Sequence, residues 1–197
     1  MRHTLIFTDG SIADNSLLNK KVGIAGFMFT SLTNTDKYIQ PWRSEFAAST
    51  KKNPDINMIE LGAVGLAMHC ISYYDPHKIS IFTDSASAYN ILTEGYHGKN
   101  DNVKPLATLA EQAYRHLIEL GFDVSLVLCK GHVDSGKQNK YLIKNGTKFS
   151  TWNTALVNAG NTMIDQYVNS IAKYGDLKQL EQYNEDDPLR KGRALTA

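Results

Sequence analysis

Four acidic residues lie at positions in the sequence from which the fold could bring their carboxylates together. Three of them occupy short strings next to apolar segments: FTDGS at residues 7–11, NMIEL at 57–61 and FTDS at 82–85. Two carboxylates ~4 Å apart repel each other by about 4 kcal/mol at an effective dielectric near 20, so a cluster of them is unfavourable unless a cation compensates it. Acids at the ends of strands and helices therefore suggest one metal-binding cluster, and the candidates are Asp9, Glu60, Asp84 and Asp165.

The first two acids also have structural interpretations. Asp9 and Gly10 form a common turn pair, although the next apolar segment begins only at Val22, which excludes a two-residue hairpin. Asn57 can cap the helix that follows it, with Glu60 completing an arrangement like a capping box. Capping and a functional role can coexist, because the first turn of that helix also points beyond the edge of the sheet.

The other two acids have comparable alternatives. Asp84 can cap a helix that starts at Ser85, but an acid at the carboxyl end of a buried strand also occupies the usual ligand position of an α/β sheet. Asp165 borders the apolar face of its helix, where an acid is most often solvated, and it shares that border with Asn161. Together the four signals favour a site, because four independent structural explanations would otherwise have to coincide.

The composition is that of an ordinary globular domain. The chain has 197 residues, 42% of them hydrophobic, which is enough for one domain with a full core. The formal net charge is +1, so a nucleic-acid partner would have to be recognised through a local patch. Cys70 and Cys129 lie inside apolar runs, which predicts buried free thiols and a reducing compartment. With no apolar run of membrane-spanning length and no signal peptide after Met1, we expect a cytoplasmic protein without a membrane partner.

Hydrophobic periodicity predicts a mixed α/β fold. Strands are expected at residues 3–8, 22–30, 36–42, 78–83 and 123–129, and helices at 57–74, 85–92, 105–120 and 155–174. The segments expected to lack regular structure are 12–21, 43–56, 93–104 and 130–154. Three antiparallel strands followed by alternating strands and helices imply a mixed sheet flanked by helices. We therefore predict one domain over residues 1–174, with a basic insertion at about 133–156 and a charged tail over 175–197.

The chain resembles the type 1 ribonuclease H family over roughly residues 3–173. The resemblance rests on the order of elements, on the strings TDGS, NMIEL and TDS, on KGH at residues 130–132, and on the spacing of Asn161 and Asp165. It implies a ribonuclease H-like fold with a five-stranded mixed sheet and helices on both sides. It also implies a two-metal endonuclease that cuts the RNA strand of RNA–DNA hybrids and leaves 5′-phosphate and 3′-hydroxyl ends.

The resemblance implies a role for each acid. Asp9 would bridge two Mg²⁺ ions, Glu60 and Asp84 would complete the protein ligands of one ion, and Asp165 would complete those of the other. His132 would assist proton transfer or product release. Mn²⁺ would be able to replace Mg²⁺. The residues expected to contact the hybrid, or to lie near the first acid, are Ser11, Asn15, Asn57, Ser85, Lys130 and Asn161.

This chemistry is coherent without the family name. Two hard cations can lower the pKa of an attacking water and neutralise a leaving 3′ oxygen. Mg²⁺ prefers oxygen ligands and keeps waters and phosphate oxygens in its shell, so a few carboxylates suffice. The 2′-hydroxyls of RNA, in the wide minor groove of a hybrid, would distinguish the strand that is cut.

The stretch between His132 and Asn161 departs from the family, because it has 28 residues where relatives usually have a handful. It is either a solvated surface loop or a flap that grips the substrate, since lysines contact phosphates and aromatic rings stack on bases. Its one acid, Asp134, is a rival for Asp165 but lies too close to His132 to share the same helix geometry. The lysines and aromatic residues of the stretch that suggest a flap are Lys137, Lys140, Lys144, Lys148, Tyr141, Phe149 and Trp152.

Two other functions are left open by the sequence. An exonuclease or junction resolvase would use the same superfold, but exonucleases of that kind favour an Asp-x-Glu pair on the first strand, whereas Asp9 is followed by Gly10 and Ser11. A noncatalytic nucleic-acid-binding domain could also retain the fold, although the presence of all four acids argues against it. We expect the protein to act as a monomer.

Overall fold

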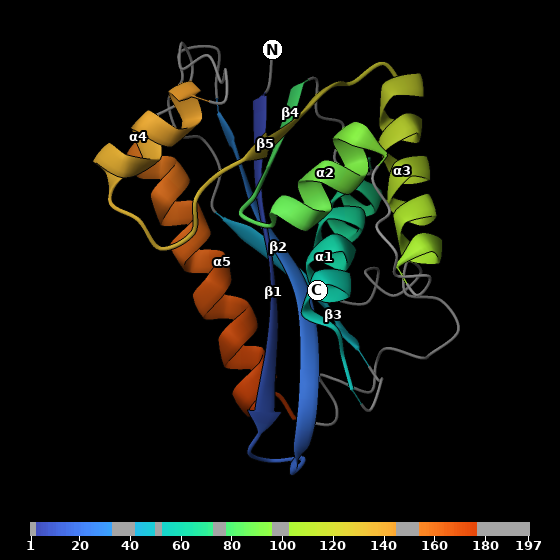
Figure 1. The fold of residues 1–197 in the computed structure, drawn as a ribbon, viewed down its shortest axis with the longest axis vertical. Coiled ribbons are helices and arrows are strands. Elements are labelled where there is room, and N and C mark those ends of the chain that lie inside the picture. The colour runs from blue at the N-terminus through green and yellow to red at the C-terminus, as the bar shows by residue number, and fades with distance from the viewer. Residues whose placement is uncertain are drawn as a thin grey trace.

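The computed structural model describes residues 3–32, 42–49, 53–72, 78–95, 103–144 and 154–176. These residues form one mixed sheet flanked by helices (Figure 1), as predicted. The strands are β1 (His3–Asn15), β2 (Lys20–Leu32), β3 (Arg43–Ser49), β4 (Lys78–Thr83) and β5 (Asp123–Leu128). The helices are α1 (Ile56–Ile71), α2 (Ala86–Glu94), α3 (Lys104–Glu119), α4 (Ser135–Lys144) and α5 (Thr154–Tyr174). None of the helices in the described ranges is long and apolar enough to span a membrane.

The sheet has five strands in the order β3-β2-β1-β4-β5. β1, β2 and β3 pair in antiparallel fashion, and β4 and β5 continue the sheet parallel to β1. α1, α2 and α3 cover one face, and α4 and α5 cover the other (Figure 1). Each face has its own buried apolar core, so the central strands are apolar on both sides.

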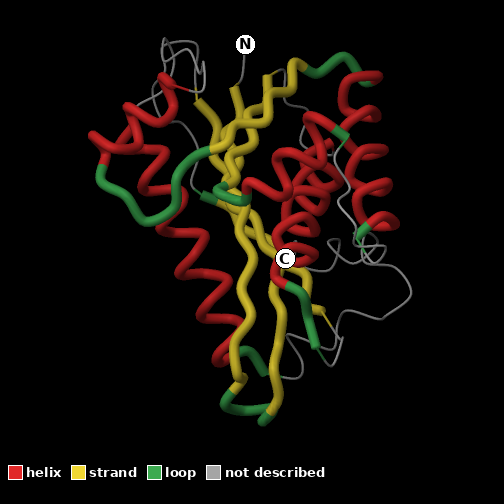
Figure 2. The backbone as a smooth tube through the Cα atoms, viewed as in Figure 1, coloured by secondary structure: helices red, strands yellow, loops and turns green. Residues whose placement is uncertain are grey.

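β1 and β2 form a longer hairpin than the sequence predicts. β1 does not end at Thr8 but continues to Asn15, and Asp9 with its following glycine lies within the paired strand instead of a turn. The turn lies at residues 16–19, where the Asn15 side chain accepts hydrogen bonds from two backbone N–H groups at 3.0 and 2.9 Å. Cross-strand pairing therefore overrides the local turn signal, and residues 12–15 are strand. Figure 2 shows both strands running on beyond the rest of the sheet.

The third strand, β3, lies in a segment predicted to be a polar connection. The predicted strand at 36–42 falls outside the described residues except for Trp42, which precedes β3. β3 pairs with β2 at the edge of the sheet and buries Phe46 in the core beneath α5. An edge strand made mostly of small and polar residues has too weak an alternation for sequence patterns to reveal it.

α1 begins at Ile56, and its cap is Asp55. The Asp55 carboxylate accepts a hydrogen bond from the backbone N–H of Asn57 at 2.9 Å. The prediction that Asn57 caps this helix, with Glu60 in a capping box, is therefore wrong. The helix also ends earlier than predicted, at Ile71. Because Asp55 takes the capping role, the Glu60 carboxylate is available for other interactions.

The remaining elements agree with the predictions to within two residues at each end, including α2, which ends at Glu94 instead of residue 92, with one exception. β4 has the predicted bounds, and α3, β5 and α5 agree to within one residue at each end. The exception is α4, a helix inside the stretch 130–154 that was expected to lack regular structure. Cys70 and Cys129 are buried free thiols, as predicted.

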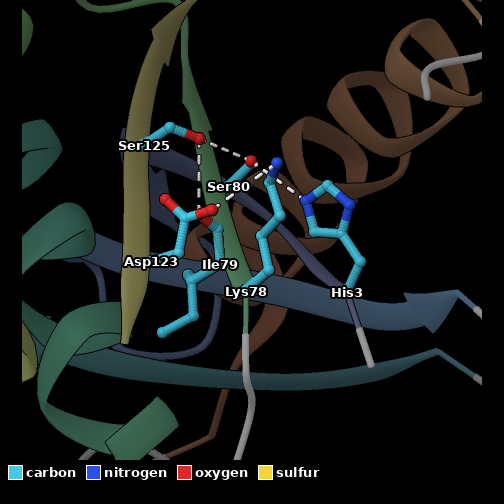
Figure 3. Close-up of polar contacts among 6 residues, drawn as sticks. All are labelled: His3, Lys78, Ile79, Ser80, Asp123 and Ser125. Carbon is cyan, nitrogen blue, oxygen red and sulfur yellow. Dashed lines mark hydrogen bonds and ion pairs between the residues drawn. The ribbon is translucent and has the colours of Figure 1, made fainter. Parts of the chain in front are cut away.

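A polar network joins the amino-terminal ends of the three parallel strands (Figure 3). The Ser80 hydroxyl on β4 lies 2.6 Å from the Ser125 hydroxyl on β5 and 3.2 Å from Nε2 of His3 on β1. An ion pair between Lys78 and Asp123, 3.6 Å long, lies at the same end. This network satisfies polar groups at the end of the sheet opposite the predicted acids, so it aligns the strands.

Candidate active site

The sheet opens at the point where β1 and β4 stop pairing. β4 pairs with β1 only as far as Phe7, opposite Phe82. The Thr8 hydroxyl then donates a hydrogen bond to the Phe82 carbonyl oxygen at 3.1 Å. Asp9 lies just beyond this point on β1, and Asp84 directly follows β4. The two acids therefore stand at the carboxyl edge of the parallel strands, where α/β sheets bind ligands.

Asp9 lies in a region of uncompensated negative charge. Burial raises the pKa of its carboxyl most, and the charges of Asp84, Asp165 and Glu60 raise it further, to about 7 from an ordinary value of 3.8. The Gly10 backbone N–H, 2.7 Å from Asp9 Oδ1, acts in the opposite direction. The structure thus brings the other three acids predicted from the sequence close enough to Asp9 for their charges to raise the pKa of its carboxyl.

Glu60 reaches this group because α1 packs closely on β1. A Cβ atom at Gly10 would lie 2.9 Å from both the Glu60 backbone nitrogen and Cγ2 of Ile59, so the strand and helix can approach only at a glycine. Burial raises the pKa of the Glu60 carboxyl, a hydrogen bond from the Ser85 hydroxyl lowers it, and the Asp84 charge raises it again. Ser85 therefore links Glu60 of α1 to the end of β4.

Asp84 is not the cap of α2, so that interpretation is wrong. The cap is Ser85, whose hydroxyl oxygen accepts a hydrogen bond from the first turn of α2 at 3.2 Å. The Asp84 carboxylate instead lies against the backbone of Gly131, where an added Cβ would collide with Oδ2. Although Asp84 reaches solvent, desolvation by the surrounding protein raises its pKa, the nearby His132 lowers it, and Asp165 raises it.

Asp165 is contributed by α5, which packs closely on the hairpin. Gly26, opposite Asp9 in the sheet, leaves room for the Val168 side chain of this helix. Asp165 is half-buried and lines the same pocket as Asp9 and Asp84. The acid therefore faces the opening of the sheet.

The loop after β5 forms another wall of the pocket. His132 lines the pocket, is exposed, and has a φ of 51°, in the left-handed region that residues other than glycine rarely adopt. Two hydrogen bonds anchor the loop, one on each side of His132. The Lys130 backbone N–H donates to Oε1 of the buried Gln138 at 2.9 Å, and Nδ2 of Asn158 donates to the Val133 carbonyl oxygen at 3.1 Å.

α4 gives the first half of the insertion a defined structure, so the insertion is not simply a solvated loop. Leu142 of this helix is fully buried in the core beneath α5. Asp134 precedes the helix, where its Oδ1 accepts a hydrogen bond from the Lys137 backbone N–H at 2.9 Å and its Oδ2 pairs with Lys137 Nζ at 3.3 Å. These contacts lower the pKa of the Asp134 carboxyl. Asp134 thus acts at the start of α4, outside the pocket, and does not take the place of Asp165.

Some of the predicted substrate-binding residues lie at or near the pocket. Lys130 and Asn161 line it, and Asn161 Nδ2 donates a hydrogen bond to Sγ of Cys129 at 2.9 Å. Lys137 and Lys140 are exposed on α4. The predicted flap residues whose side chains lie outside the described part of the structure are Lys144, Lys148, Phe149 and Trp152.

Four other predicted binding residues do not line the pocket. Ser11, Asn15 and Ser85 are buried and hydrogen-bonded inside the protein, and Asn57 is exposed at the start of α1. Asn15 in particular donates to two carbonyl oxygens at the end of α5, both at 3.0 Å, which is a structural role. Contacts of these residues with a substrate stay predictions.

Several pocket residues were missed by the sequence patterns. Asn158 and Thr162 share the face of α5 that carries Asp165, so helical spacing could have indicated them. Thr8 directly precedes the first acid and lines the pocket as well. Gln138, which does not line the pocket but anchors its loop at Lys130, had no usable signal, because the helix that carries it was not recognised.

The chemistry of the four acids fits a hard divalent cation, which prefers oxygen ligands. Within the described ranges, none of the four forms an ion pair with a lysine or arginine, so nothing there offsets the burial and the neighbouring acids that raise the pKa of Asp9. The described residues nevertheless contain no group of three or more His, Cys, Asp and Glu side chains arranged so that it could hold a metal ion as it stands. A cation would therefore have to draw the carboxylates closer together.

The metal-free protein is expected to lose stability as the pH rises from about 4 to about 7. Because the pKa of Asp9 is raised from 3.8 to about 7, the folded state binds more protons than the unfolded state in this window. The free energy of unfolding then falls with rising pH, by at most about 4 kcal/mol and by less after solvent screening at a half-buried group. The raised pKa values of Glu60 and Asp84 act in the same direction.

Melting temperatures at pH 5 and pH 8 measure this effect. The decrease between the two should be smaller in an Asp9→Asn variant, and Mg²⁺ should raise the melting temperature of the unsubstituted protein at pH 8 by binding the folded state. An Asp9→Asn variant with an unchanged pH dependence would show that Asp9 is not the group responsible.

Comparison with known protein families identifies the class of protein. A family model described as RNase H matches residues 1–173. The chain belongs to the ribonuclease H family. It is accordingly a ribonuclease H enzyme, a nuclease of RNA–DNA hybrids, in a family that generally depends on divalent metal ions. A comparison with curated proteins returned no significant match.

Solved structures similar to this chain include three ribonucleases H1. The enzyme from the halophilic archaeon Halobacterium salinarum is 15% identical, over 71% of this chain and 93% of its own, with a TM-score of 0.46. LC11-RNase H1, isolated from compost, is 14% identical, over 75% of this chain and 100% of its own, with a TM-score of 0.49. LC9-RNase H1 is 16% identical, over 85% of each chain, with a TM-score of 0.48. These values are too low to transfer the roles of individual residues.

Proposed function

We propose that this protein is an endonuclease that hydrolyses the RNA strand of RNA–DNA hybrids to 5′-phosphate and 3′-hydroxyl ends. One observation carries the proposal: three acids from three other parts of the fold lie near Asp9 at the carboxyl edge of the sheet, where burial first and then their charges raise its pKa. These are Glu60 from α1, Asp84 after β4 and Asp165 from α5. Such a group of acids, in a member of the ribonuclease H family, is suited to hydrolysis of a phosphodiester.

Asp9, Glu60, Asp84 and Asp165 are the residues that would hold two Mg²⁺ ions, with Mn²⁺ as a substitute. Four ionised carboxylates carry four negative charges, which two divalent ions balance. When bound, the ions would activate a water and neutralise the leaving 3′ oxygen. Asp9 is the best candidate for the shared ligand, because all three other acids act on it.

His132 is the proposed proton carrier. It is exposed at the pocket next to Asp84, on a loop anchored by Gln138 and Asn158. An imidazole can both accept and release a proton near neutral pH. The anchored loop would keep the ring near the reacting phosphate while leaving it open to solvent.

Lys130 and Lys140 are proposed to contact the hybrid backbone. Lys130 lines the pocket, and Lys140 is exposed on α4, whereas Lys137 is paired with Asp134. The acids of the pocket repel phosphate groups, so nearby positive charges are needed to bring the substrate in.

Replacing Lys130 and Lys140 together by alanine should therefore raise KM for the hybrid and leave kcat nearly unchanged. Each lost phosphate contact reduces the slope of log affinity against log salt by about 1, so the slope should fall by about 2. The matched control is Lys173→Ala, an exposed lysine in the last turn of α5. Unchanged KM and salt dependence in the folded double variant would contradict this role.

The function is tested by incubating the protein and Mg²⁺ with end-labelled RNA–DNA hybrid, DNA duplex, RNA duplex and branched DNA. Internal cuts confined to the RNA strand of the hybrid are the expected result. Stepwise release from an end would indicate an exonuclease, cutting of branched DNA a resolvase, and binding without cutting a noncatalytic domain. Each of these three results would overturn the proposal.

A further inference from the structure

A chain of two hydrogen bonds connects Asp165 to the strand that carries Asp9. Nδ2 of Asn169 donates to Oδ1 of Asp165 at 2.7 Å. The Ser11 hydroxyl donates to Oδ1 of the same Asn169 at 2.6 Å. Ser11 is buried and both Asn169 and Asp165 are half-buried, so both bonds are partly shielded from competing water. The two residues join positions that are far apart in the sequence but adjacent at the contact of α5 with β1.

The chemistry of the three side chains decides which group donates in each of these two hydrogen bonds. An ionised carboxylate can only accept hydrogen bonds, so the NH₂ group of Asn169 must face Asp165. The amide oxygen of Asn169 then faces Ser11, whose hydroxyl can donate to it. Turning the amide over would place its oxygen against the Asp165 carboxylate and break that bond, even though the Ser11 hydroxyl could then accept from the NH₂ group, so the two bonds favour this one arrangement of Asn169. The arrangement therefore selects one orientation of the Asp165 carboxylate.

These two hydrogen bonds also link Asp165 to the strand face that carries Asp9. Side chains two positions apart on a strand point to the same face, so Ser11 and Asp9 both face α5. Phe7, two positions earlier, contacts α5 as well, at Gly160. Ser11 therefore lies on the same strand and face as Asp9. Through Asn169 it is hydrogen-bonded to Asp165 of α5.

We infer that Asn169, supported by Ser11, is a positioning residue that orients Asp165 as a metal ligand. The inference rests on the proposed function. Asn169 occupies Oδ1 of Asp165, and Oδ2 accepts no hydrogen bond from the described residues, which leaves it available to a cation. Groups that orient a metal ligand typically contribute 10- to 100-fold to metal affinity or activity.

The experiment is a calorimetric titration of the protein with Mg²⁺ alone, combined with melting temperatures of the metal-free variants. Asn169→Leu removes both hydrogen bonds at similar size, and Ser11→Ala removes only the supporting one. We expect Asn169→Leu to weaken Mg²⁺ binding about 10- to 100-fold and Ser11→Ala to weaken it less. The matched control is Gln166→Ala, an exposed residue of the same helix, which should bind Mg²⁺ normally.

An Asp165→Asn variant separates this inference from the proposed function. If Asp165→Asn loses Mg²⁺ affinity while Asn169→Leu and Ser11→Ala keep it, the positioning role is overturned and the metal site stands. A lower melting temperature of the metal-free Asn169→Leu protein with unchanged affinity also overturns it, because that pattern belongs to a purely structural residue. If Asp165→Asn binds Mg²⁺ normally, both the inference and the role of Asp165 fail.

Discussion

Replacing Asp9 by asparagine is expected to lower the rate of hybrid cleavage at least ~10³-fold. Asp9 is the acid on which the other three act, and it is the proposed shared ligand. Asparagine keeps the shape of the side chain but removes its charge and one of its two ligand oxygens. Metal ions stabilise such transition states by several kcal/mol, and each 1.4 kcal/mol corresponds to a tenfold change in rate. Single-turnover cleavage of an end-labelled hybrid measures the loss.

The control for this variant is Asp14→Asn. Asp14 lies on the same strand, is exposed, and does not line the pocket, so its replacement should leave activity intact. The metal-free Asp9→Asn protein should melt at a higher temperature than the unsubstituted protein at pH 8, because it lacks a carboxylate that burial and like charges disfavour. That increase would show that the variant is folded. Normal cleavage by Asp9→Asn would rule out the proposed metal site.

Replacing Gly160 by alanine is expected to destabilise the protein by about 1–3 kcal/mol. A Cβ atom there would lie 2.5 Å from two ring atoms of Phe7. Phe7 is fully buried and stacked on Phe82, with ring centroids 4.9 Å apart, so it has no room to move aside. α5 would have to shift away from β1 and carry Asp165 with it. Denaturant unfolding measures the change, and cleavage should fall together with stability.

Gly62→Ala is the matched control, because Gly62 lies inside α1 and also packs on the sheet. A Cβ atom there would have its nearest neighbours at 3.8 Å, in Ala25 and Leu106, which is ordinary contact. Alanine is more favourable than glycine inside a helix by about 0.5–1 kcal/mol, so this variant should be stabilised by that amount. If both alanine variants changed stability in the same direction, close packing at Gly160 would not be the cause.

The core elements could be predicted because their apolar residues repeat with a clear period. β4 is a short apolar run buried on both faces, and α3 and α5 carry apolar stripes at helical spacing. Asp84 could be proposed because it follows an apolar strand whose carboxyl end meets the edge of the sheet, whereas Asp9, inside β1, and Asp165, in the middle of α5, were found from the strings around them and not from element ends. Glu60 was proposed from the string around it, near the start of an apolar helix.

The parts that could not be predicted depend on partners far away in the sequence. β1 continues past Asp9 because β2 pairs with it, although the local Asp-Gly pair favours a turn. α4 is stabilised by the burial of Leu142 and by the bond from the Lys130 N–H to Gln138, neither of which gives a periodic signal. The contact of Ser11 with Asn169 joins residues 158 positions apart, which no local pattern can indicate.

The attachment of α5 to the hairpin has a consequence for the synthesis of the protein. Asn15 donates to the carbonyl oxygens of Ala172 and Gly175, and the Ser16 backbone N–H donates to that of Lys173, across 157 to 160 positions of chain. The entropic cost of closing a loop grows only with the logarithm of its length, but contacts this far apart in the sequence form slowly. A ribosome must therefore release nearly the whole domain before its first strand meets its last helix. Partly made chains would lack Asp165 of α5, so nascent protein should not cleave RNA–DNA hybrids.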